Sequence, residues 1–428
     1  MRYCQRCVYP ENTKPMILFD EKGVCSGCKL IESRKEFVEN KINWTEREQW
    51  FCKLLNEYKQ KARENGSPYD CIIPVSGGKD SHYQVHLIKN VYGLNPLLVT
   101  YNHSYNTKRG IRNLNNMVKK FGCDLIRFTT NPHAAAKISR YMLKKVGDIT
   151  WHYHAGIKTF PIQMAVQYKI PLMIWGEVAF AELTGMFNQD DMAEFTKKVR
   201  REHSMRGFEP GDILHDPENT EITKQDLAPF FYPSDEDIEK LGLKGIYVSN
   251  FINWNARPQT REMIENYGFE THCGPRQRTF NLYDKLEDWA NPIHDYLKYL
   301  KFGYGRTTDD ASTEIRHGRM SREQGIEKVR THDHVRPKEM DRFLEFLGIT
   351  EQKFLDSIGH LRDMDIWKQK DDGTWVVKDS VVNHIYDSGV EAARLSNIRE
   401  WQEFVPANVP KNISPEDLQN EDLDFTVL

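Results

Sequence analysis

A glycine-rich turn between an apolar strand and a helix is the feature that most constrains how this chain folds. Residues 69–75 predict a buried strand, Ser76-Gly77-Gly78-Lys79-Asp80-Ser81 follows directly, and residues 82–90 have a helical pattern. Gly77 and Gly78 allow the backbone to bend tightly and to approach a ligand closely. Because the amides at a helix N-terminus then point toward that ligand, we expect the turn to bind an anion.

The side chains of this turn indicate a phosphate group with a metal ion beside it. Ser76 and Ser81 offer hydroxyl donors, and Lys79 offers a positive charge. Asp80 would repel a phosphate unless a cation lay between them, so we expect Mg²⁺ there. The turn differs from the P-loop, in which serine or threonine follows the lysine. An ordinary polar turn is the alternative, and the match at every position disfavours it.

Strands and helices alternate along the chain around this turn. The predicted strands after it lie at 96–102, 124–129 and 171–175, and the predicted helices between them at 107–121, 133–145 and 157–168. This alternation predicts a doubly wound parallel sheet in an α/β fold. Ligands bind such sheets at the carboxyl ends of the strands, where the turn also lies. From about residue 281 the pattern is mainly helical, with a small hairpin expected at 371–377.

Four cysteines near the start of the chain form two C-x-x-C pairs, Cys4 with Cys7 and Cys25 with Cys28. Thiolates at this spacing can close a tetrahedral zinc site. Such a site leaves no open position for water, so we expect a structural zinc ion whose binding supplies the folding energy of a short zinc ribbon. A redox role for one C-x-x-C pair is the weaker alternative, because two matched pairs indicate a shared metal.

Charge and hydropathy exclude some classes of protein. The formal net charge of −3 over 428 residues disfavours a large nucleic-acid partner. The basic runs at 197–201 and 316–322 are interpreted as solvated helix faces. No apolar run approaches the ~20 residues that a membrane span needs. Because the N-terminus also lacks the apolar core of a signal peptide, we expect a cytoplasmic protein.

The turn at residues 76–81 resembles the pyrophosphate loop of the N-type ATP pyrophosphatases, which include asparagine, GMP and NAD synthetases and tRNA thiolation enzymes. The resemblance implies a five-stranded parallel sheet of the adenine nucleotide alpha hydrolase type. It also implies adenylation of a carbonyl oxygen with release of pyrophosphate. By the same analogy, Thr100 and Tyr101, at the end of the second strand, lie near the adenosine of ATP.

A second segment, residues 176–185, begins at Gly176 and resembles the glycine-to-glutamate segment of NAD synthetases. The matching glutamate is a magnesium ligand in those enzymes, and this implies that role for Glu182, with Glu177 as the alternative. Asp80 is then the other magnesium ligand. The expected ATP-binding residues are therefore residues 76–81, Thr100, Tyr101 and Gly176.

The cysteine pairs, the turn and residues 301–312 together resemble the N-acetyl sugar amidotransferases of bacterial surface-polysaccharide pathways, including lipopolysaccharide O-antigen biosynthesis. That family converts an acetamido group of a sugar to an acetamidino group. The resemblance implies ATP and Mg²⁺ as cofactors and catalytic roles for Lys79, Asp80, Lys301 and Arg306. For Lys301 and Arg306 the alternative is a surface helix and turn.

The ammonia for this reaction needs a source. A glutaminase with an N-terminal nucleophile needs cysteine after the initiator methionine, and Arg2 stands there. The resemblance implies a separate glutaminase subunit as partner and a diacetamido sugar or nucleotide-sugar as substrate. Two rival functions remain open, namely tRNA thiolation and a non-catalytic nucleotide-binding scaffold.

The expected domains are a zinc-binding module at 1–40, a helical linker at 41–68, an ATP pyrophosphatase domain at 69–260 and a mainly helical region at 261–428. The last region is expected to bind the acceptor or a partner subunit. His152 and His154 fall in an aromatic segment just before the predicted helix at 157–168. They either line the sugar or adenylate site or form a buried structural pair, and the sequence leaves both possibilities open.

Overall fold

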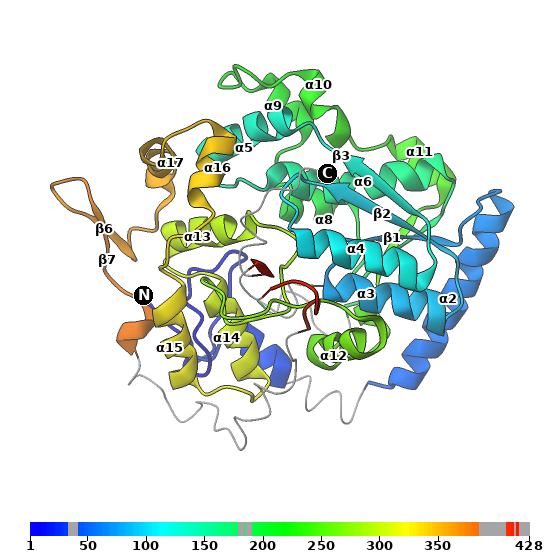
Figure 1. Cartoon of the computed structure of the whole chain (residues 1–428), viewed down its shortest axis with the longest axis horizontal. Helices are drawn as coiled ribbons and strands as arrows, with labels where there is room; N and C mark the ends of the chain where they lie inside the picture. Colours follow the sequence, from blue (N-terminus) through cyan, green and yellow to red (C-terminus); the bar gives the residue numbers. More distant parts are fainter. Residues whose placement is uncertain (33–41, 179–183, 185–190, 385–407, 415–416, 419–428) are drawn as a thin grey trace.

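A parallel sheet organises the larger part of the chain in the computed structural model, which describes residues 1–32, 42–178, 184, 191–384, 408–414 and 417–418 (Figure 1). Its five strands have the order β3-β2-β1-β4-β5. The strands are β1 Cys71–Pro74, β2 Pro96–Asn102, β3 Leu125–Thr129, β4 Leu172–Trp175 and β5 Lys244–Tyr247. The order reverses direction between β1 and β4, which makes the sheet doubly wound and confirms the predicted fold class.

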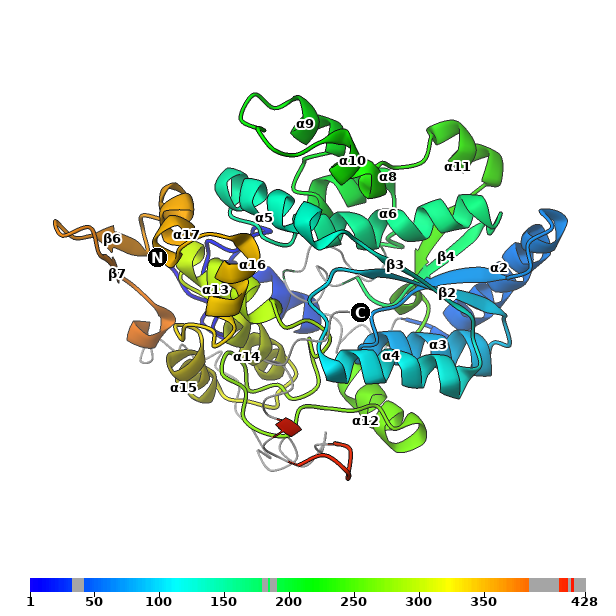
Figure 2. The same ribbon diagram turned by 45° about the horizontal axis from the view of Figure 1, so that its top comes forward.

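Helices cover both faces of the sheet, with α3 and α4 on one face and α5 and α6 on the other (Figure 2). Side chains along β1 alternate between two buried clusters, so that Ile72 packs beneath α5 and α6 while Cys71 and Ile73 pack toward α2, α3 and α4. Burial on both faces explains why β1, β2 and β4 are mostly apolar. The helices are α2 Trp44–Glu64, α3 Lys79–Val85, α4 Lys108–Phe121, α5 Pro132–Val146 and α6 Trp151–Gln167.

Two helix boundaries differ from the sequence prediction. Helix α3 begins at Lys79 rather than residue 82, so the second half of the glycine-rich turn is its first turn, and a π-helical segment at His86–Val91 continues it. Helix α6 begins at Trp151 rather than residue 157. The histidine and aromatic segment therefore lies inside the helix and not before it, because the apolar residues of its first turns are buried all round.

Shorter helices connect β4 to β5 and lead from β5 to the C-terminal region. They are α8 Lys197–Val199, the π-helical Arg200–Ser204, α9 Pro210–His215, α10 Lys224–Leu227, α11 Asp235–Leu241 and α12 Ala256–Tyr267. The 3-10 turns of the described chain are Ala228–Phe230, Val248–Asn250, Gly359–Leu361 and Val381–His384. Helix α12 packs against α3, which carries the glycine-rich turn.

The region after residue 281 is mainly helical, as predicted. Its helices are α13 Asn291–Phe302, α14 Arg306–Arg316, α15 Arg322–His332, α16 Met340–Leu347 and α17 Glu351–Ile358. The predicted hairpin is present, with β6 Trp367–Gln369 antiparallel to β7 Trp375–Val377. Helices α16 and α17 pack on α5, which joins this region to the sheet domain.

Residues 1–32, called here the cysteine module, pack on α14 and α15 (Figure 1). Val8 and Val24 of the module share a buried cluster with Ala311, Ile315 and Ile326 of those helices. The module therefore shares its core with the C-terminal region, although the two lie at opposite ends of the sequence.

The interpretation of the two basic runs as solvated helix faces is wrong for three of their arginines. Arg200 and Arg322 are fully buried and Arg316 is 5% exposed. Arg200 forms an ion pair with Glu209 at 2.8 Å, and the other two lie against the cysteine module. These guanidinium groups hold segments together inside the molecule. The run of basic residues in the sequence therefore wrongly predicted that they face solvent. None of the described helices is both long and apolar enough to span a membrane.

Candidate active site

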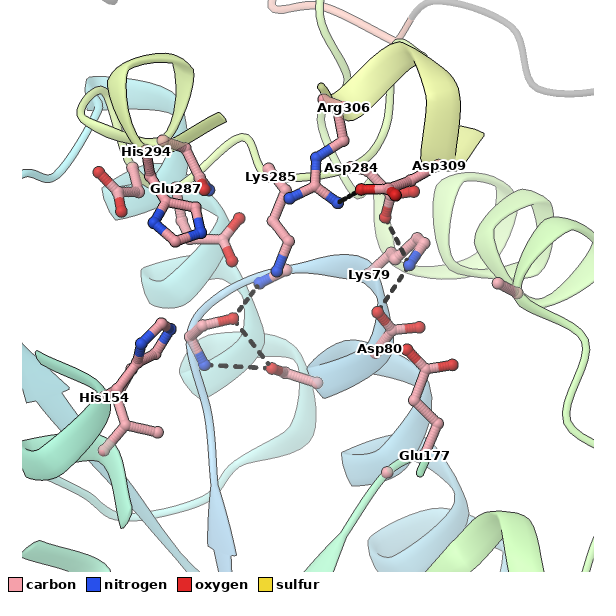
Figure 3. A pocket seen from close by; sticks show the side chains of 18 of the residues that line it. Lys79, Asp80, His154, Glu177, Asp284, Lys285, Glu287, His294, Arg306 and Asp309 are labelled. Atoms are coloured by element: carbon pink, nitrogen blue, oxygen red, sulfur yellow. Dashed lines mark hydrogen bonds and ion pairs between the residues drawn. The ribbon is translucent and has the colours of Figure 1, made fainter. Parts of the chain in front are cut away.

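A cavity of ≈ 1530 Å³ lies at the carboxyl ends of the strands, between the sheet and the C-terminal helices (Figure 3). Residues 76 and 78–81, the ends of β2 and β4, and parts of α13 and α14 line it. Pockets for single small ligands usually measure about 300–1,000 Å³. The cavity therefore has room for a nucleotide together with a second substrate.

The turn of residues 76–81, called here the phosphate loop, is held in shape by its own hydroxyl groups. The Ser76 amide donates to the Ser81 hydroxyl at 3.1 Å, and the Gly78 amide donates to the Ser76 hydroxyl at 3.2 Å. Gly77 has a φ of +90°, and a Cβ atom there would lie 2.9 Å from the carbonyl oxygen of Gly110. Glycine is therefore required at position 77 for both conformation and space.

Lys79 bridges two carboxylates inside the cavity. Its Nζ atom lies 2.6 Å from Asp80 Oδ2 and 2.6 Å from Asp284 Oδ1 (Figure 3). Burial alone would lower the pKa of Lys79, but the charges of Asp284, Asp80 and Glu177 raise it well above its usual value. Lys79 therefore contributes a positive charge to the phosphate loop. Asp284 was missed in the sequence, because its role appears only when the C-terminal region folds over the loop.

Carboxylates near Lys79 offer the oxygen ligands that Mg²⁺ prefers. Asp80 and Glu177 both line the cavity, and Glu177 directly follows Gly176 beyond the end of β4 (Figure 3). Glu182, the first choice for a magnesium ligand, lies outside the described residues. The donor set present at the site, with Asp284 opposite, fits a hard divalent cation bound together with phosphate oxygens.

The residues expected near adenosine also line the cavity. Thr100, Tyr101 and Gly176 lie at the ends of β2 and β4. The Tyr101 ring packs so closely on α6 that a Cβ atom at Gly156 would lie 2.4 Å from it. The lining positions of Thr100, Tyr101 and Gly176 agree with the sequence analysis, and their contact with ATP stays a prediction.

Lys301 and Arg306 line the cavity and do not form a surface helix and turn. Lys301 Nζ donates to the Gly147 carbonyl at 2.8 Å, and burial lowers its pKa to about 8. Arg306 makes a two-pronged ion pair with Asp295, at 3.1 Å from Nε and 3.0 Å from a terminal nitrogen. Asp309 lies 3.7 Å from its other terminal nitrogen. Carboxylates thus already surround Arg306, which indicates a positioning role.

The structure separates the two histidines that the sequence could not assign. His152 is fully buried, and its Nε2 lies 3.1 Å from the Tyr105 hydroxyl. His154 lines the cavity, as does His294 from α13 (Figure 3). His152 is therefore a structural residue, whereas His154 is accessible to a ligand.

The four cysteines of the cysteine module are buried, and their sulfur atoms all lie within 4.8 Å of one another. Cys4 and Cys28 sulfurs are 4.0 Å apart, and Cys7 and Cys25 sulfurs are 3.7 Å apart. A tetrahedral zinc ion with Zn–S bonds of about 2.3 Å places its ligands roughly 3.8 Å apart. Backbone amides of Cys7 and Cys25 donate to Cys4 Sγ at 3.4 and 3.3 Å. The thiols therefore fit a structural zinc ion.

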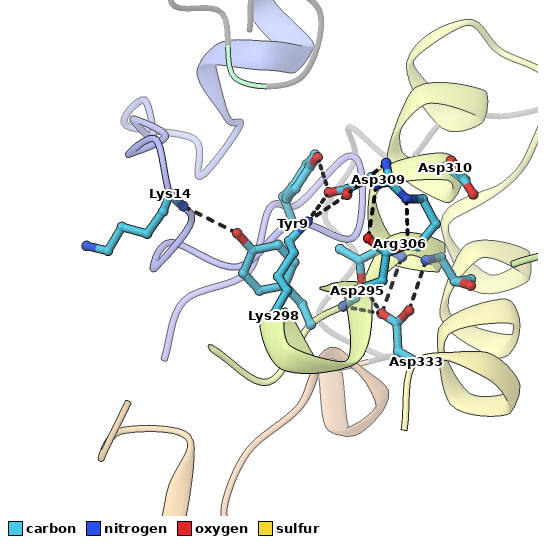
Figure 4. A network of polar contacts seen from close by, with 12 residues as sticks. Tyr9, Lys14, Asp295, Lys298, Arg306, Asp309, Asp310 and Asp333 are labelled. Atoms are coloured by element: carbon cyan, nitrogen blue, oxygen red, sulfur yellow. Dashed lines mark hydrogen bonds and ion pairs between the residues drawn. The ribbon is translucent and has the colours of Figure 1, made fainter. Parts of the chain in front are cut away.

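A network of polar contacts joins the cysteine module to the cavity (Figure 4). The Tyr9 hydroxyl donates to Asp309 Oδ1 at 2.6 Å, and Lys298 Nζ lies 2.6 Å from Asp309 Oδ2. The backbone amide of Lys14 donates to the Tyr304 hydroxyl at 3.3 Å. Because Lys14, Lys298 and Asp309 all line the cavity, the module forms part of its support.

Residues 275–381 match the family model described as "LPS biosynthesis protein WbpG-like, C-terminal domain". Residues 275–381 are therefore similar to that domain, and they are called here the WbpG-like domain. The WbpG-like domain supplies the cavity wall opposite the phosphate loop, with Asp284, His294, Lys301, Arg306 and Asp309. The match is consistent with the resemblance to surface-polysaccharide amidotransferases.

An uncharacterized protein of Methanocaldococcus jannaschii is 31% identical to this chain over 124 residues, which are 29% of this chain and 41% of that protein. Two solved structures also align. NMN synthetase from Francisella tularensis has a TM-score of 0.26 and 14% identity, covering 55% of this chain and all of that one. NH₃-dependent NAD synthetase from Campylobacter jejuni has a TM-score of 0.26 and 12% identity, and the alignment covers 47% of this chain and 92% of that one. These scores are too low to establish a shared fold.

Proposed function

We propose that this chain is an ATP-dependent amidotransferase that converts an acetamido group of a bacterial surface-polysaccharide sugar to an acetamidino group. The observation that carries the proposal is the shared cavity, in which a phosphate loop on the sheet domain faces the WbpG-like domain. The ion pair between Lys79 and Asp284 joins the two sides. A nucleotide on the loop would therefore lie next to whatever the WbpG-like domain holds.

The chemistry of an amide explains why such an enzyme would need ATP. An amide carbonyl is a poor electrophile, and its oxygen is a poor leaving group. Transfer of AMP to that oxygen releases pyrophosphate and makes the oxygen a good leaving group. Ammonia then adds to the carbon, and AMP departs with the C–O bond. The enzyme therefore has to hold negative charge on pyrophosphate and keep water from the activated carbon.

The residues of the phosphate loop suit the first of these tasks. The amides at the start of α3 and the Ser76 and Ser81 hydroxyls would hold the leaving pyrophosphate. Lys79 would exchange its contacts with Asp80 and Asp284 for phosphate oxygens. Asp80 and Glu177 would hold Mg²⁺, which supplies further positive charge when bound. Lys79 should prefer the phosphate oxygens to the two carboxylates, because phosphate carries more negative charge than either carboxylate.

The substrate and the ammonia source follow from the resemblance. We propose a diacetamido sugar, free or carried on a nucleotide, and ammonia from a separate glutaminase subunit. The WbpG-like domain would bind the sugar, because it forms the wall of the cavity that faces the phosphate loop. The volume of ≈ 1530 Å³ allows both substrates to be present together.

The test is an assay of the purified chain with ATP, Mg²⁺, ammonium chloride and a UDP-linked diacetamido hexose. We expect AMP, pyrophosphate and a sugar whose mass changes by the replacement of one oxygen with NH. The Lys79→Ala variant should form these products roughly 10²–10³-fold more slowly, and the exposed-lysine variant Lys53→Ala should match the wild type. Formation of ADP would contradict the proposal. Inactivity with every acetamido sugar, combined with sulfur transfer to tRNA, would assign the chain to the thiolation enzymes.

A further inference from the structure

Residues 281–288 of the WbpG-like domain, called here the cover segment, pack against the sheet domain beside the phosphate loop. The Thr107 amide, just before α4, donates to the Glu287 carbonyl at 3.1 Å. A Cβ atom at Gly110 would lie 2.5 Å from Glu287 Cα, and a Cβ atom at Gly78 would lie 3.4 Å from Glu287 Oε1. The cover segment therefore contacts both the start of α4 and the phosphate loop itself.

Within this segment, Lys285 has a backbone conformation that lysine rarely adopts. Its φ is +52°, in the left-handed region that favours glycine. Arg276 helps to fix this conformation, because its guanidinium donates to the Asp284 carbonyl at 2.6 Å and to the Lys285 carbonyl at 3.2 Å. Backbone strain of this kind concentrates at functional sites. The strain indicates that the lysine side chain, which glycine would not supply, is needed at this position.

The side chain of Lys285 extends from the cover segment toward the phosphate loop (Figure 3). The neighbouring Asp284 binds Lys79 of that loop at 2.6 Å, which fixes the backbone of Lys285 beside the loop. Lys285 lines the cavity and is exposed. Within the described part of the chain its ammonium group makes no hydrogen bond or ion pair, whereas Arg306 in the same cavity pairs with a carboxylate. Lys285 therefore offers its charge to a ligand.

A second lysine of the cavity, Lys158 of α6, has no carboxylate partner among the described residues either. Its Nζ atom lies 3.5 Å from the centroid of the Trp175 ring, at the end of β4. Burial and the positive charge of Lys285 lower the pKa of Lys158 to about 7. Two cations that repel each other across one cavity favour an anion bound there, because the anion offsets the repulsion.

We propose that Lys285 binds phosphate oxygens of the ATP molecule on the phosphate loop, so that the WbpG-like domain completes the nucleotide site. The assignment rests on the proposed function, which identifies the anion as the phosphate chain of a nucleotide. The amides of α3 and the Lys79 ammonium approach the phosphates from the sheet domain, and Lys285 approaches them from the opposite wall. Its ammonium group has three N–H donors for phosphate oxygens.

The same contact acts on the leaving group during adenylation. The amide oxygen forms a bond to the α-phosphorus of ATP while the bond from that phosphorus to the bridging α–β oxygen breaks, and the electron pair of the broken bond leaves with pyrophosphate. Negative charge therefore accumulates on the group that Lys285 contacts. Because a positive group beside developing charge lowers the barrier, AMP formation should decrease together with phosphate affinity when Lys285 is replaced.

The decisive variant is Lys285→Gly, which removes the ammonium group and introduces the residue that the backbone conformation favours. We therefore expect it to fold about as stably as the wild type. Lys169→Gly is the matched control, because Lys169 is also an exposed lysine with a left-handed φ, of +56°. Lys169 precedes β4, at the opposite end of that strand from Gly176, and does not belong to the lining of the cavity. Lys285→Arg keeps a positive charge.

Isothermal titration calorimetry of the full-length protein with Mg²⁺ and α,β-methylene ATP, which cannot release pyrophosphate, measures binding without turnover. We expect Lys285→Gly to raise the Kd by about tenfold or more, the scale of one hydrogen bond to a charged group. Lys285→Arg should restore most of the affinity, and Lys169→Gly should match the wild type. Unchanged Kd in Lys285→Gly would overturn the proposal.

Two further probes separate a phosphate contact from a distorted site. Pyrophosphate with Mg²⁺ should lose affinity for Lys285→Gly as the ATP analogue does. Adenosine, which has no phosphate, should bind this variant and the wild type equally. An equal loss for adenosine would show that the substitution distorts the cavity, and it would overturn Lys285 as a phosphate ligand.

A direct test uses the full-length protein with ¹³Cε-labelled lysine. The resonance that is missing from Lys285→Gly identifies Lys285, and the one missing from Lys169→Gly identifies the control. Pyrophosphate with Mg²⁺ should shift the first resonance and leave the second unchanged. The absence of a shift would overturn the Lys285 assignment even if the wild type forms AMP and amidine. A shift without AMP formation on any acetamido sugar would support the Lys285 contact and overturn the proposed function instead.

Discussion

The hydroxyl of Tyr9 donates a hydrogen bond of 2.6 Å to the carboxylate of Asp309, and this bond joins the cysteine module to the wall of the cavity. Both residues are buried, at 2% and 5% exposure. Asp309 also contacts Lys298 and Arg306 through its second oxygen. The module therefore supports a charged wall of the site, in addition to carrying four cysteines that fit a metal ion.

Replacing Tyr9 with phenylalanine tests this connection. The Tyr9→Phe variant should lose about 1.5–3 kcal/mol of unfolding free energy, because a buried bond to a charged acceptor is removed. Urea denaturation followed by circular dichroism measures the change. Tyr232→Phe is the control, since within the described chain its hydroxyl makes no hydrogen bond. Equal stability of the two variants would contradict a supporting role for the Tyr9 bond.

The cysteine module should contain one zinc ion per chain. The double variant Cys4→Ser/Cys25→Ser should lose the metal, as measured by elemental analysis, and its unfolding transition should begin at a lower temperature. Arg316 lies 3.5 Å from Cys25 Sγ, and Arg322 donates to the Cys4 carbonyl. Metal loss should therefore loosen α14 and α15 as well as the module. Zinc content unchanged in the double variant would disprove the assignment.

The charge pairs of the phosphate loop should be essential for release of AMP and pyrophosphate. Lys79→Ala and Asp80→Ala should each lower the rate by roughly 10²–10³, the scale for losing one group that stabilises developing charge. Asp284→Asn should lower it as well, because Lys79 loses the partner that holds it over the loop. Rates of pyrophosphate release in variants with native circular dichroism provide the measurement. Near-normal turnover of Lys79→Ala would show that the loop does not bind the phosphates.

Local patterns explain why most of the sheet could be predicted and β5 could not. Strands β1 to β4 are apolar runs next to turn residues, whereas β5 is Lys244-Gly245-Ile246-Tyr247, with a charge and a glycine. It forms a strand because Ile246 pairs with Ile174 of β4. Position 245 has to be glycine because a Cβ atom there would lie 2.9 Å from the Phe195 carbonyl oxygen. Such contacts depend on the tertiary fold.

The candidate site could also be predicted only in part from the sequence, because some of its residues depend on tertiary contacts. The phosphate loop is contiguous in the sequence, so its shape and charge were recognisable there. Asp284 and His294 acquire meaning only through contacts with residues far away in the chain, and no spacing pattern marks them. Arg316 and Arg322 were misjudged for a related reason, because a buried arginine and a solvated one look alike in a sequence.

Acid sensitivity should arise from the buried pair of Asp295 and Arg306. Burial raises the pKa of Asp295, but Arg306 and the other cations lower it to about 2 in the folded protein, from a usual 3.8. The folded state therefore binds the proton less readily than the unfolded state. The ionised Asp295 carboxylate therefore stabilises the folded state fully above about pH 4, and this stabilisation is lost as the pH falls toward 2.

The Asp295→Asn variant checks this effect. It should cost on the order of 2 kcal/mol of unfolding free energy at pH 7 and should show a flatter decline between pH 4 and 2. Urea denaturation across that range measures both, with the exposed Asp356→Asn variant as control. An acid limb as steep as that of the wild type would exclude Asp295 as its source.

We expect the use of glutamine as nitrogen source to depend on a separate glutaminase. Glutamine alone should give no amidine with the isolated chain, because its amide nitrogen has first to be released as ammonia. A high concentration of ammonium at raised pH should rescue the reaction, since free NH₃ is the nucleophile and its fraction increases with pH. Added glutaminase partner should restore the use of glutamine at neutral pH, where little free ammonia exists.

The comparison of glutamine with ammonium, each with ATP, Mg²⁺ and a UDP-linked diacetamido hexose, measures this dependence through amidine formed per AMP. With the partner present, amidine per AMP should be higher than with an equal amount of free ammonia, because delivery within a complex raises the local ammonia concentration and limits hydrolysis by water. Efficient use of glutamine by the isolated chain would show that it has its own glutaminase activity. In that case the partner would be unnecessary, while the roles of Lys79 and Asp284 would remain to be judged from pyrophosphate release.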